Sequence, residues 1–179
     1  MELSATAYVI LGMLHLEPHT GYEIKGKVDN STRFFWAASY GQIYPELKRL
    51  AEAGLVKGEP HSRGGRRRTV YRLTAAGRKE LRRWLERPAE TFEMRDEGLL
   101  KLFFSGAASP AAARETLAAK RGYHEQKLER LRAVEALAKS SSDPYPYMVL
   151  GYGLEFNQWI VDWCKRAERE LSRIERKAA

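Results

Sequence analysis

The sequence predicts a mainly α-helical protein: an N-terminal domain over residues 1–88 with one short β-hairpin, and a helical domain over residues 89–179. Three observations lead to this prediction. Apolar residues recur at steps of three and four through most of the 179 residues. A single pair of short β-like runs interrupts this pattern, around the glycine pair at residues 64–65. After Pro88 the composition changes, and a basic half gives way to one with nearly balanced charge.

Two helices are predicted at the start of the chain. The first covers Leu3–Leu16, where apolar side chains fall at helical spacing, Ser4 can cap the first turn and Pro18 ends the pattern. A second, shorter helix is predicted after Thr20, and it ends near Asn30.

A third helix is predicted from an N-cap at Ser39 to a stop at Gly54. Pro45 lies inside it and removes one backbone hydrogen bond, so the regular part could begin as late as Gly41 or bend at the proline. Its predicted core residues are Ile43, Leu47 and Leu50.

Two strand-like runs follow, at residues 55–60 and 68–74, and a loop with two glycines joins them. Glycines at a hairpin tip tolerate positive φ, so we expect a two-stranded ribbon with its tip in this loop. Thr74 is the predicted cap of a fourth helix over residues 75–86. That helix is expected to bury Leu81, Trp84 and Leu85.

Three helices are predicted in the C-terminal domain. The apolar cluster at residues 99–104 predicts a short helix that is packed on most sides. Ser109 followed by Pro110 predicts the start of a helix that runs to about Lys139. Residues 147–177 predict a long amphipathic helix with a seam like that of a coiled coil. The expected anchors of the middle helix are Leu117, Leu128, Leu131 and Leu137.

The net charge of +8 is concentrated in the first half of the chain. Residues 1–87 hold 16 Lys and Arg against 9 Asp and Glu, whereas the remainder holds 15 against 14. A localised basic excess favours a polyanionic partner. Cys164 is the single cysteine and the N-terminus is typical of neither a signal peptide nor a membrane span, so we expect a cytoplasmic protein.

The order helix, helix, helix, hairpin, helix is that of a winged helix-turn-helix domain. In such a domain the third helix enters the major groove of DNA and the hairpin, called the wing, lies beside it. The sequence therefore predicts double-stranded DNA as a partner. The candidate DNA contacts of the third helix are Ser39, Tyr40, Gln42, Tyr44, Lys48 and Arg49, and those of the wing are Arg63, Arg66, Arg67 and Arg68.

Each set of candidates has a plain alternative. Gln42 can pair with N6 and N7 of adenine, Tyr44 can reach a phosphate or a thymine methyl, and Lys48 suits a phosphate. The same residues could equally form the solvated face of a helix. Four arginines within six positions repel one another, and a nearby polyanion relieves that cost, although such runs are usually solvated. The two sets side by side favour DNA contact.

The last predicted helix carries a band of aromatic side chains that the preceding helix is too polar to cover alone. A second copy of the chain is the expected partner, which predicts a homodimer. Apolar residues at helical spacing are usually core, and this is the first interpretation of the band. Alternatively, part of it lines a cavity between subunits for a flat effector, with Phe34 and Trp36 as further contributors. The band residues assigned to the dimer interface or effector site are Tyr152, Phe156, Trp159 and Trp163.

Several runs resemble the PadR family of prokaryotic transcriptional regulators, among them LSATAYVILGMLHLEPHTGYEIKGKV, SYGQIYPELKRLAEAGLVK and VYRLTAAGRKEL. The most diagnostic run is GQIYPELKRL, Gly41–Leu50, and the family tolerates Pro45 in this helix. LLKLFF, Leu99–Phe104, is similar to the longer subfamily, which has a helical dimerisation domain. The resemblance implies a homodimeric repressor of a near-palindromic operator, relieved in many members by a small aromatic or hydrophobic effector, with effector residues that vary among members.

Other function classes fit less well. The four histidines show no metal-ligand spacing, and neither a catalytic set, a phosphate loop nor a dinucleotide fingerprint is evident, so we expect no enzyme and no cofactor. RNA binding is disfavoured because the basic half lacks the stacking aromatics of a single-strand platform. A non-specific DNA-architectural protein without an effector is the main alternative.

Overall fold

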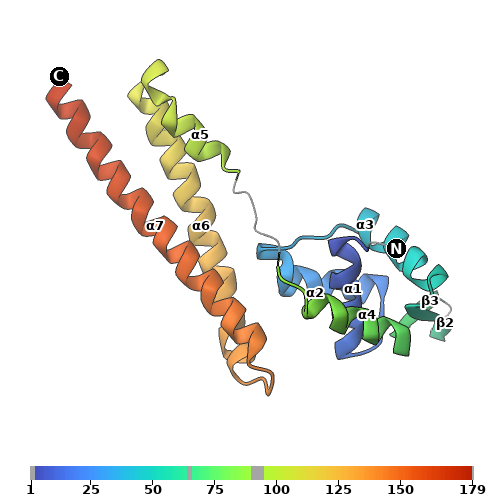
Figure 1. Cartoon of the computed structure of the whole chain (residues 1–179). Coiled ribbons are helices and arrows are strands. Elements are labelled where there is room, and N and C mark those ends of the chain that lie inside the picture. The colour runs from blue at the N-terminus through green and yellow to red at the C-terminus, as the bar shows by residue number, and fades with distance from the viewer. Residues whose placement is uncertain (1–2, 64–65, 90–94, 179) are drawn as a thin grey trace. The chain divides into compact units, whose positions relative to one another are not determined.

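The computed structural model describes residues 3–63, 66–89 and 95–178. The chain forms two compact units, Met1–Thr91 and Phe92–Ala179 (Figure 1). Across the described ranges, no helix is long and apolar enough to cross a membrane.

Within its described residues the first unit has four α-helices. Its helical elements are α1 (Ala5–Leu16), α2 (Gly21–Asn30), the 3-10 turn η1 (Thr32–Phe34), α3 (Tyr40–Glu52) and α4 (Ala75–Leu85). Ser4 and Thr74 cap α1 and α4 as predicted, whereas Ser39 at the start of α3 makes no side-chain cap hydrogen bond. Oγ of Ser4 accepts a hydrogen bond from the Ala7 amide at 3.1 Å, and Oγ1 of Thr74 accepts one from the Gly77 amide at 3.0 Å. These bonds satisfy donors that a helix N-terminus leaves free.

Helix α3 begins at Tyr40 and continues through Pro45. The proline lies beyond the first turn, where its missing donor costs the helix one bond to the carbonyl of Gly41. Gly54 ends the helix with a φ of +69°, a conformation that side chains disfavour. The predicted core residues Ile43, Leu47 and Leu50 are all fully buried.

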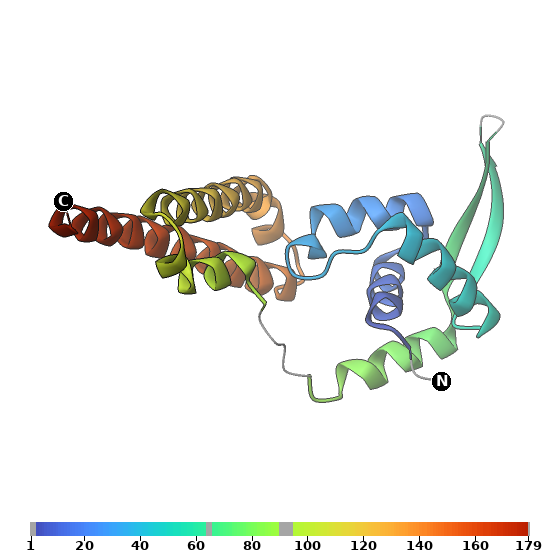
Figure 2. The same ribbon diagram turned by 90° about the horizontal axis from the view of Figure 1, so that it is seen from above.

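The small sheet has three antiparallel strands in the order β1-β3-β2. Strands β2 (Val56–Arg63) and β3 (Arg66–Leu73) pair from Val56 opposite Leu73 to Arg63 opposite Arg66. Figure 2 shows this hairpin extending beyond the helices of its unit. The predicted two-stranded ribbon omitted β1 (His19–Thr20), which pairs with β3 and is too short to show a periodic pattern.

The core of the first unit lies between α1, α2 and α3, and α4 and the base of the hairpin complete it. Leu81 of α4 is buried, as predicted, but Trp84 and Leu85 are 40% and 67% exposed. Trp84 instead covers Tyr8 of α1 in a parallel stack with ring centroids 4.5 Å apart. Only the first two turns of α4 therefore contribute to the core.

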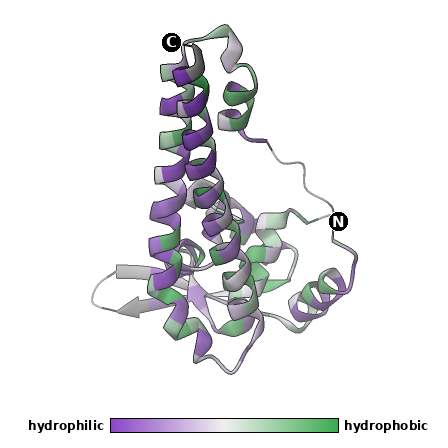
Figure 3. Cartoon of the chain, turned by 90° about the vertical axis from the view of Figure 1, so that its left-hand side faces the viewer, coloured by the Kyte–Doolittle hydropathy of each residue, from purple (hydrophilic) through white to green (hydrophobic). Residues whose placement is uncertain are grey.

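The second unit is a long helical hairpin with a short helix against it. Its elements are α5 (Glu97–Phe103), the 3-10 turn η2 (Ser105–Ala107), α6 (Pro110–Lys139) and α7 (Tyr145–Ala178). Helices α6 and α7 lie side by side and antiparallel (Figures 1 and 3), and hydrophobic residues are interleaved with hydrophilic ones along both. Apolar residues fill the seam, namely Ala113, Leu117, Leu128, Leu131, Leu150, Ile160, Val161 and Cys164.

Two packing predictions for this unit are wrong. Phe103 and Phe104 at the end of α5 are 81% and 62% exposed, and Leu100 is 59% exposed, although this cluster was expected to be packed on most sides. Leu137, an expected anchor of α6, is 76% exposed. A hairpin of two helices offers one buried seam, so apolar residues outside that seam have no cover within the chain.

Candidate functional site

Helix α3 presents one stripe of side chains to solvent because its opposite side is in the core. Tyr40, Tyr44 and Lys48 follow one another at intervals of four residues, which places them along one face of the helix. Tyr40 is 44% exposed, Tyr44 is 50% exposed and the side chain of Lys48 is 79% exposed. The structure therefore brings these three predicted residues together on one accessible surface.

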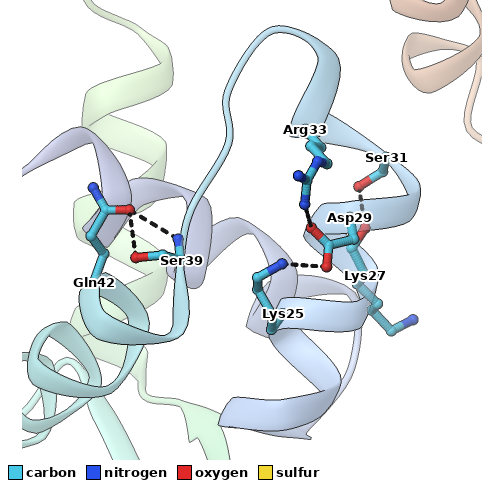
Figure 4. Close-up of polar contacts among 7 residues, drawn as sticks. All are labelled: Lys25, Lys27, Asp29, Ser31, Arg33, Ser39 and Gln42. Atoms are coloured by element: carbon cyan, nitrogen blue, oxygen red, sulfur yellow. Dashed lines mark hydrogen bonds and ion pairs between the residues drawn. The ribbon is translucent and has the colours of Figure 1, made fainter. Parts of the chain in front are cut away.

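Ser39 and Gln42 are engaged with each other at the start of α3 (Figure 4). The backbone N–H and the hydroxyl of Ser39 both donate to Oε1 of Gln42, at 2.9 and 3.1 Å. These two bonds occupy the carbonyl oxygen of the Gln42 amide and leave its Nε2 donor for a partner. To form the predicted two-bond pair with adenine, Gln42 would have to release Ser39.

Among the described residues, the two cationic residues near the end of α3 form weak ion pairs with neighbouring carboxylates. Nζ of Lys48 is 3.9 Å from a carboxylate oxygen of Glu52, and Nη1 of Arg49 is 3.5 Å from one of Glu46. The Lys48 and Arg49 side chains are 79% and 72% exposed, and pairs of this kind contribute little in water. Both cations can therefore exchange these carboxylates for another anion.

The wing arginines are described to different extents. Backbone pairing sets Arg63 directly opposite Arg66 on the hairpin. The side chains of Arg63, Arg66 and Arg67 lie outside the described residues. Arg68 is described: its side chain is 40% exposed, and Nη1 lies 3.9 Å from Oε1 of Glu23 on α2.

A stack of tyrosine rings crosses from α2 to α3, and sequence reasoning missed it. The ring centroids of Tyr22 and Tyr40 are 6.2 Å apart with planes 16° from parallel, and those of Tyr40 and Tyr44 are 6.2 Å apart at 24°. The expectation that the basic half lacks stacking aromatics is therefore wrong. The four-residue spacing of Tyr40 and Tyr44 was visible in the sequence, but the approach of Tyr22 depends on how α2 packs on α3.

The second unit carries an exposed aromatic face on α7, made by Tyr152, Phe156 and Trp159. Their exposed fractions are 60%, 38% and 58%, while Trp163 is half-buried. The rings of Tyr152 and Phe156 stack at 5.8 Å. Together with Glu155, the three aromatic residues line a shallow cavity of about 310 Å³ that opens widely to solvent. The aromatic band is thus not part of the core of a single chain.

A buried polar pair lies behind this aromatic face. Nδ1 of His124 is 2.7 Å from Oδ1 of Asn157, and Nδ2 of Asn157 donates to the carbonyl of Gly153 at 2.6 Å. Because the Asn157 amide nitrogen is used in this way, its oxygen is the acceptor and Nδ1 of His124 carries the proton. Burial lowers the pKa of His124, and the ring meets Phe156 edge to face at 6.4 Å.

The arrangement offers two exposed binding surfaces. Within the described ranges, no group of three or more His, Cys, Asp or Glu side chains could hold a metal ion. The α3 stripe presents hydroxyl and cationic groups suited to phosphates and base edges, and the α7 face presents flat apolar rings.

Comparisons with known proteins match both units. The profile of the "Transcriptional regulator PadR-like family" matches residues 10–83, and that of "Virulence activator alpha C-term" matches residues 94–172. The negative transcriptional regulator PadR of Bacillus subtilis is 31% identical over 166 residues, which cover 87% of this chain and 91% of that protein. The chain belongs to the PadR family.

Solved structures of the PadR family show the same fold along nearly the whole chain. Bacillus subtilis PadR in complex with operator DNA has a TM-score of 0.84 and 30% identity, over 94% of this chain and 99% of that one. Bacillus subtilis PadR in complex with p-coumaric acid has a TM-score of 0.74 and 27% identity, over 96% and 99%. The winged-helix prediction and the family resemblance seen in the sequence are thereby confirmed.

Proposed function

We propose that this PadR-family chain is a homodimeric repressor that binds a near-palindromic operator and releases it when a small aromatic or hydrophobic effector binds. The observation that carries the proposal is the exposed stripe on α3 in the same unit as an arginine-rich hairpin. A winged-helix domain uses this pair of elements to enter a major groove and to grip the adjacent backbone.

Support for DNA binding comes from chemistry and from similarity together. Tyr40, Tyr44 and Lys48 offer hydroxyl and ammonium donors along one face of α3, and Arg49 and Arg68 add exposed cations. Bacillus subtilis PadR, whose structure contains operator DNA, shares the fold over 94% of this chain. The wing residues Arg63, Arg66 and Arg67 are proposed as further phosphate or minor-groove contacts.

The aromatic face of α7 supports a dimer. Tyr152 and Trp159 each leave more than half of their area exposed, and Met148 on the same helix is 66% exposed. Adjacent exposed apolar groups of this size are typical of a protein interface. A twofold dimer would present two copies of α3, whose separation of about 34 Å or a multiple would match successive major grooves.

The cavity beside Tyr152, Phe156 and Trp159 is the proposed effector site. Flat aromatic compounds stack on such rings, and Bacillus subtilis PadR has been solved with p-coumaric acid, a planar phenol. An effector bound there would weaken operator binding if it binds more tightly to a dimer geometry that does not fit DNA than to one that does. The loss of operator affinity cannot exceed this difference in effector affinity.

Fluorescence anisotropy tests the proposal against its main alternative. The duplex immediately upstream of the coding region and a random duplex of equal length are titrated at one salt concentration. We expect a specificity ratio of about 10³ or more for a repressor, whereas a ratio near one would indicate a DNA-architectural protein.

Tryptophan emission tests the effector. A panel of planar aromatic compounds is expected to include one that quenches emission and lowers operator affinity in the same concentration range. A panel in which no compound does either would contradict the effector part of the proposal.

A further inference from the structure

The tyrosine stack extends the exposed surface of α3 onto α2. Tyr22, the second residue of α2, is 69% exposed, more than either tyrosine of α3. Three exposed aromatic rings in contact are uncommon on a soluble surface unless that surface binds a partner. The predicted DNA contacts lie on α3 and the wing alone and do not include Tyr22.

The stack is built into the packing of the two helices. A Cβ atom at Gly21 would lie 2.7 Å from Cε1 and 3.0 Å from Cζ of Tyr44, closer than side chains approach one another. The Tyr44 ring can therefore lie against the start of α2 only because residue 21 is glycine. Nζ of Lys25 lies 5.5 Å from the centre of the Tyr40 ring, and an ion pair with Asp29 holds this lysine in place (Figure 4).

Cationic side chains lie on the same elements as the stack or contact them. Lys48 follows Tyr44 by one helical turn, and Arg68 of β3 contacts Glu23, the residue after Tyr22. The Glu23 carboxylate is itself occupied, since Oε2 accepts hydrogen bonds from the amide and hydroxyl of Thr20 at 2.7 and 2.9 Å. The Arg68 side chain is 40% exposed and its 3.9 Å pair with Oε1 of Glu23 is weak, so its guanidinium can also face an anion near the start of α2.

The phenolic hydroxyls of the stack are free to bind. Within the part of the chain that the structure describes, the hydroxyls of Tyr22, Tyr40 and Tyr44 have no protein hydrogen-bond partner. A phenolic hydroxyl is a good donor to a phosphate oxygen.

We propose that Tyr22 is a further DNA-contact residue, whose hydroxyl donates to a backbone phosphate beside the groove that α3 enters. In helix-turn-helix proteins the first helix of the motif crosses the backbone while the second lies in the groove. A hydroxyl at the start of α2 then meets a phosphate rather than a base edge. The inference rests on the proposed function, because it requires that α3 bind DNA.

The variant Tyr22→Phe tests this contact because it removes one oxygen atom and keeps the ring stack. Full-length protein is titrated with the upstream duplex and with the random duplex over a range of salt concentrations. We expect affinity to fall about tenfold on both duplexes, the usual effect of losing a hydrogen bond to a charged group. The slope of log K against log salt should not change, since a neutral hydroxyl displaces no counterion.

Tyr145→Phe is the matched control. Tyr145 is 72% exposed at the start of α7, in the other unit, and loses the same oxygen atom. The affinity of the Tyr145→Phe variant for both duplexes should equal that of the unmodified protein. Urea unfolding of both variants should also match the unmodified protein, which separates a lost contact from a lost fold.

The outcomes separate this inference from the proposed function. If the unmodified protein binds and Tyr22→Phe binds equally well, the phosphate contact is wrong and the proposed function stands. A loss confined to the upstream duplex would also overturn the inference, since it would indicate a base contact. If the unmodified protein binds neither duplex, the proposed function fails and this inference fails with it.

Discussion

At the scale of single residues, His124 is the group whose charge the fold constrains most clearly. Its ring lies in the seam between α6 and α7, bonded to Asn157 and in edge contact with Phe156. Burial lowers its pKa below the ordinary value of 6.5, and the nearby Lys120 and Lys127 act in the same direction. The folded protein therefore keeps His124 neutral at a pH where the unfolded chain is partly protonated.

This difference predicts a pH-dependent stability. As pH falls below about 6.5, the unfolded state binds a proton that the folded state excludes, so the free energy of unfolding decreases. Above that pH the contribution is fully present. Urea unfolding between pH 7.5 and 5.5 should show this decrease in the free energy of unfolding. The decrease should be smaller in the His124→Gln variant.

The control is His61→Gln, which alters an exposed histidine of β2. It should leave the pH dependence of the unmodified protein intact. Burial also lowers the pKa of His19, so part of the decrease should persist in His124→Gln. An unchanged pH dependence in His124→Gln would contradict the assignment of this effect to the buried pair.

Among the elements, the arginines of the hairpin are proposed to strengthen DNA binding through contacts with phosphates. Helix α3 is proposed to set the position of the domain on the bases. A cation at the DNA backbone releases counterions, and each neutralised phosphate changes the slope of log K against log salt by about 0.9. The four wing arginines should therefore affect salt dependence, whereas a hydrogen-bonding residue of α3 such as Gln42 should affect preference among bases.

Replacing Arg63, Arg66, Arg67 and Arg68 by alanine is expected to weaken binding to every duplex and to flatten the salt dependence. The matched control replaces Arg166, Arg169, Arg173 and Arg176 of α7, which removes the same charge from the other unit. Titrations at 50 to 200 mM salt give the slopes. Equal slopes for the wing variant and the control would show that the wing arginines contact DNA phosphates no more than the arginines of α7 do.

The elements also show how far the sequence could predict the structure. Helices with a clear cap and period, such as α1 after Ser4 and α6 after Ser109, were predicted nearly to the residue. Strand β1 was missed because a strand of two residues is too short to show an alternating pattern. Trp84 was wrongly predicted to be buried because periodicity shows that one face of α4 is apolar but not how far along the helix other elements cover that face. The contact of Tyr22 with Tyr40 was missed because it depends on how α2 packs on α3.

For the molecule as a whole, the proposed operator binding requires two copies of the chain. A single α3 makes few contacts, and two half-sites bound together multiply affinity as well as specificity. The aromatic face of α7 is the proposed contact between copies, and the cavity beside it gives an effector access to the same surface. Dimerisation, operator binding and effector response are then linked through one helix.

Charge placed on this face should separate the copies. The double variant Tyr152→Lys and Trp159→Lys is expected to be monomeric at micromolar concentration and to lose at least about 100-fold in operator affinity. Leu137→Lys, at an apolar position of α6 that is 76% exposed, should remain dimeric. Sedimentation equilibrium measures the oligomeric state of both variants, and fluorescence anisotropy measures their operator affinity. A double variant that remains dimeric would show that the dimer interface lies elsewhere.

A footprint of the protein on the DNA immediately upstream of its own coding region shows whether the chain binds an operator as a dimer. Two dimer-related copies of α3 predict a symmetric protected site, with half-site centres about 10 base pairs apart or a multiple of that spacing. A protein that protects no segment of this DNA even in dilute buffer would contradict operator binding by this chain.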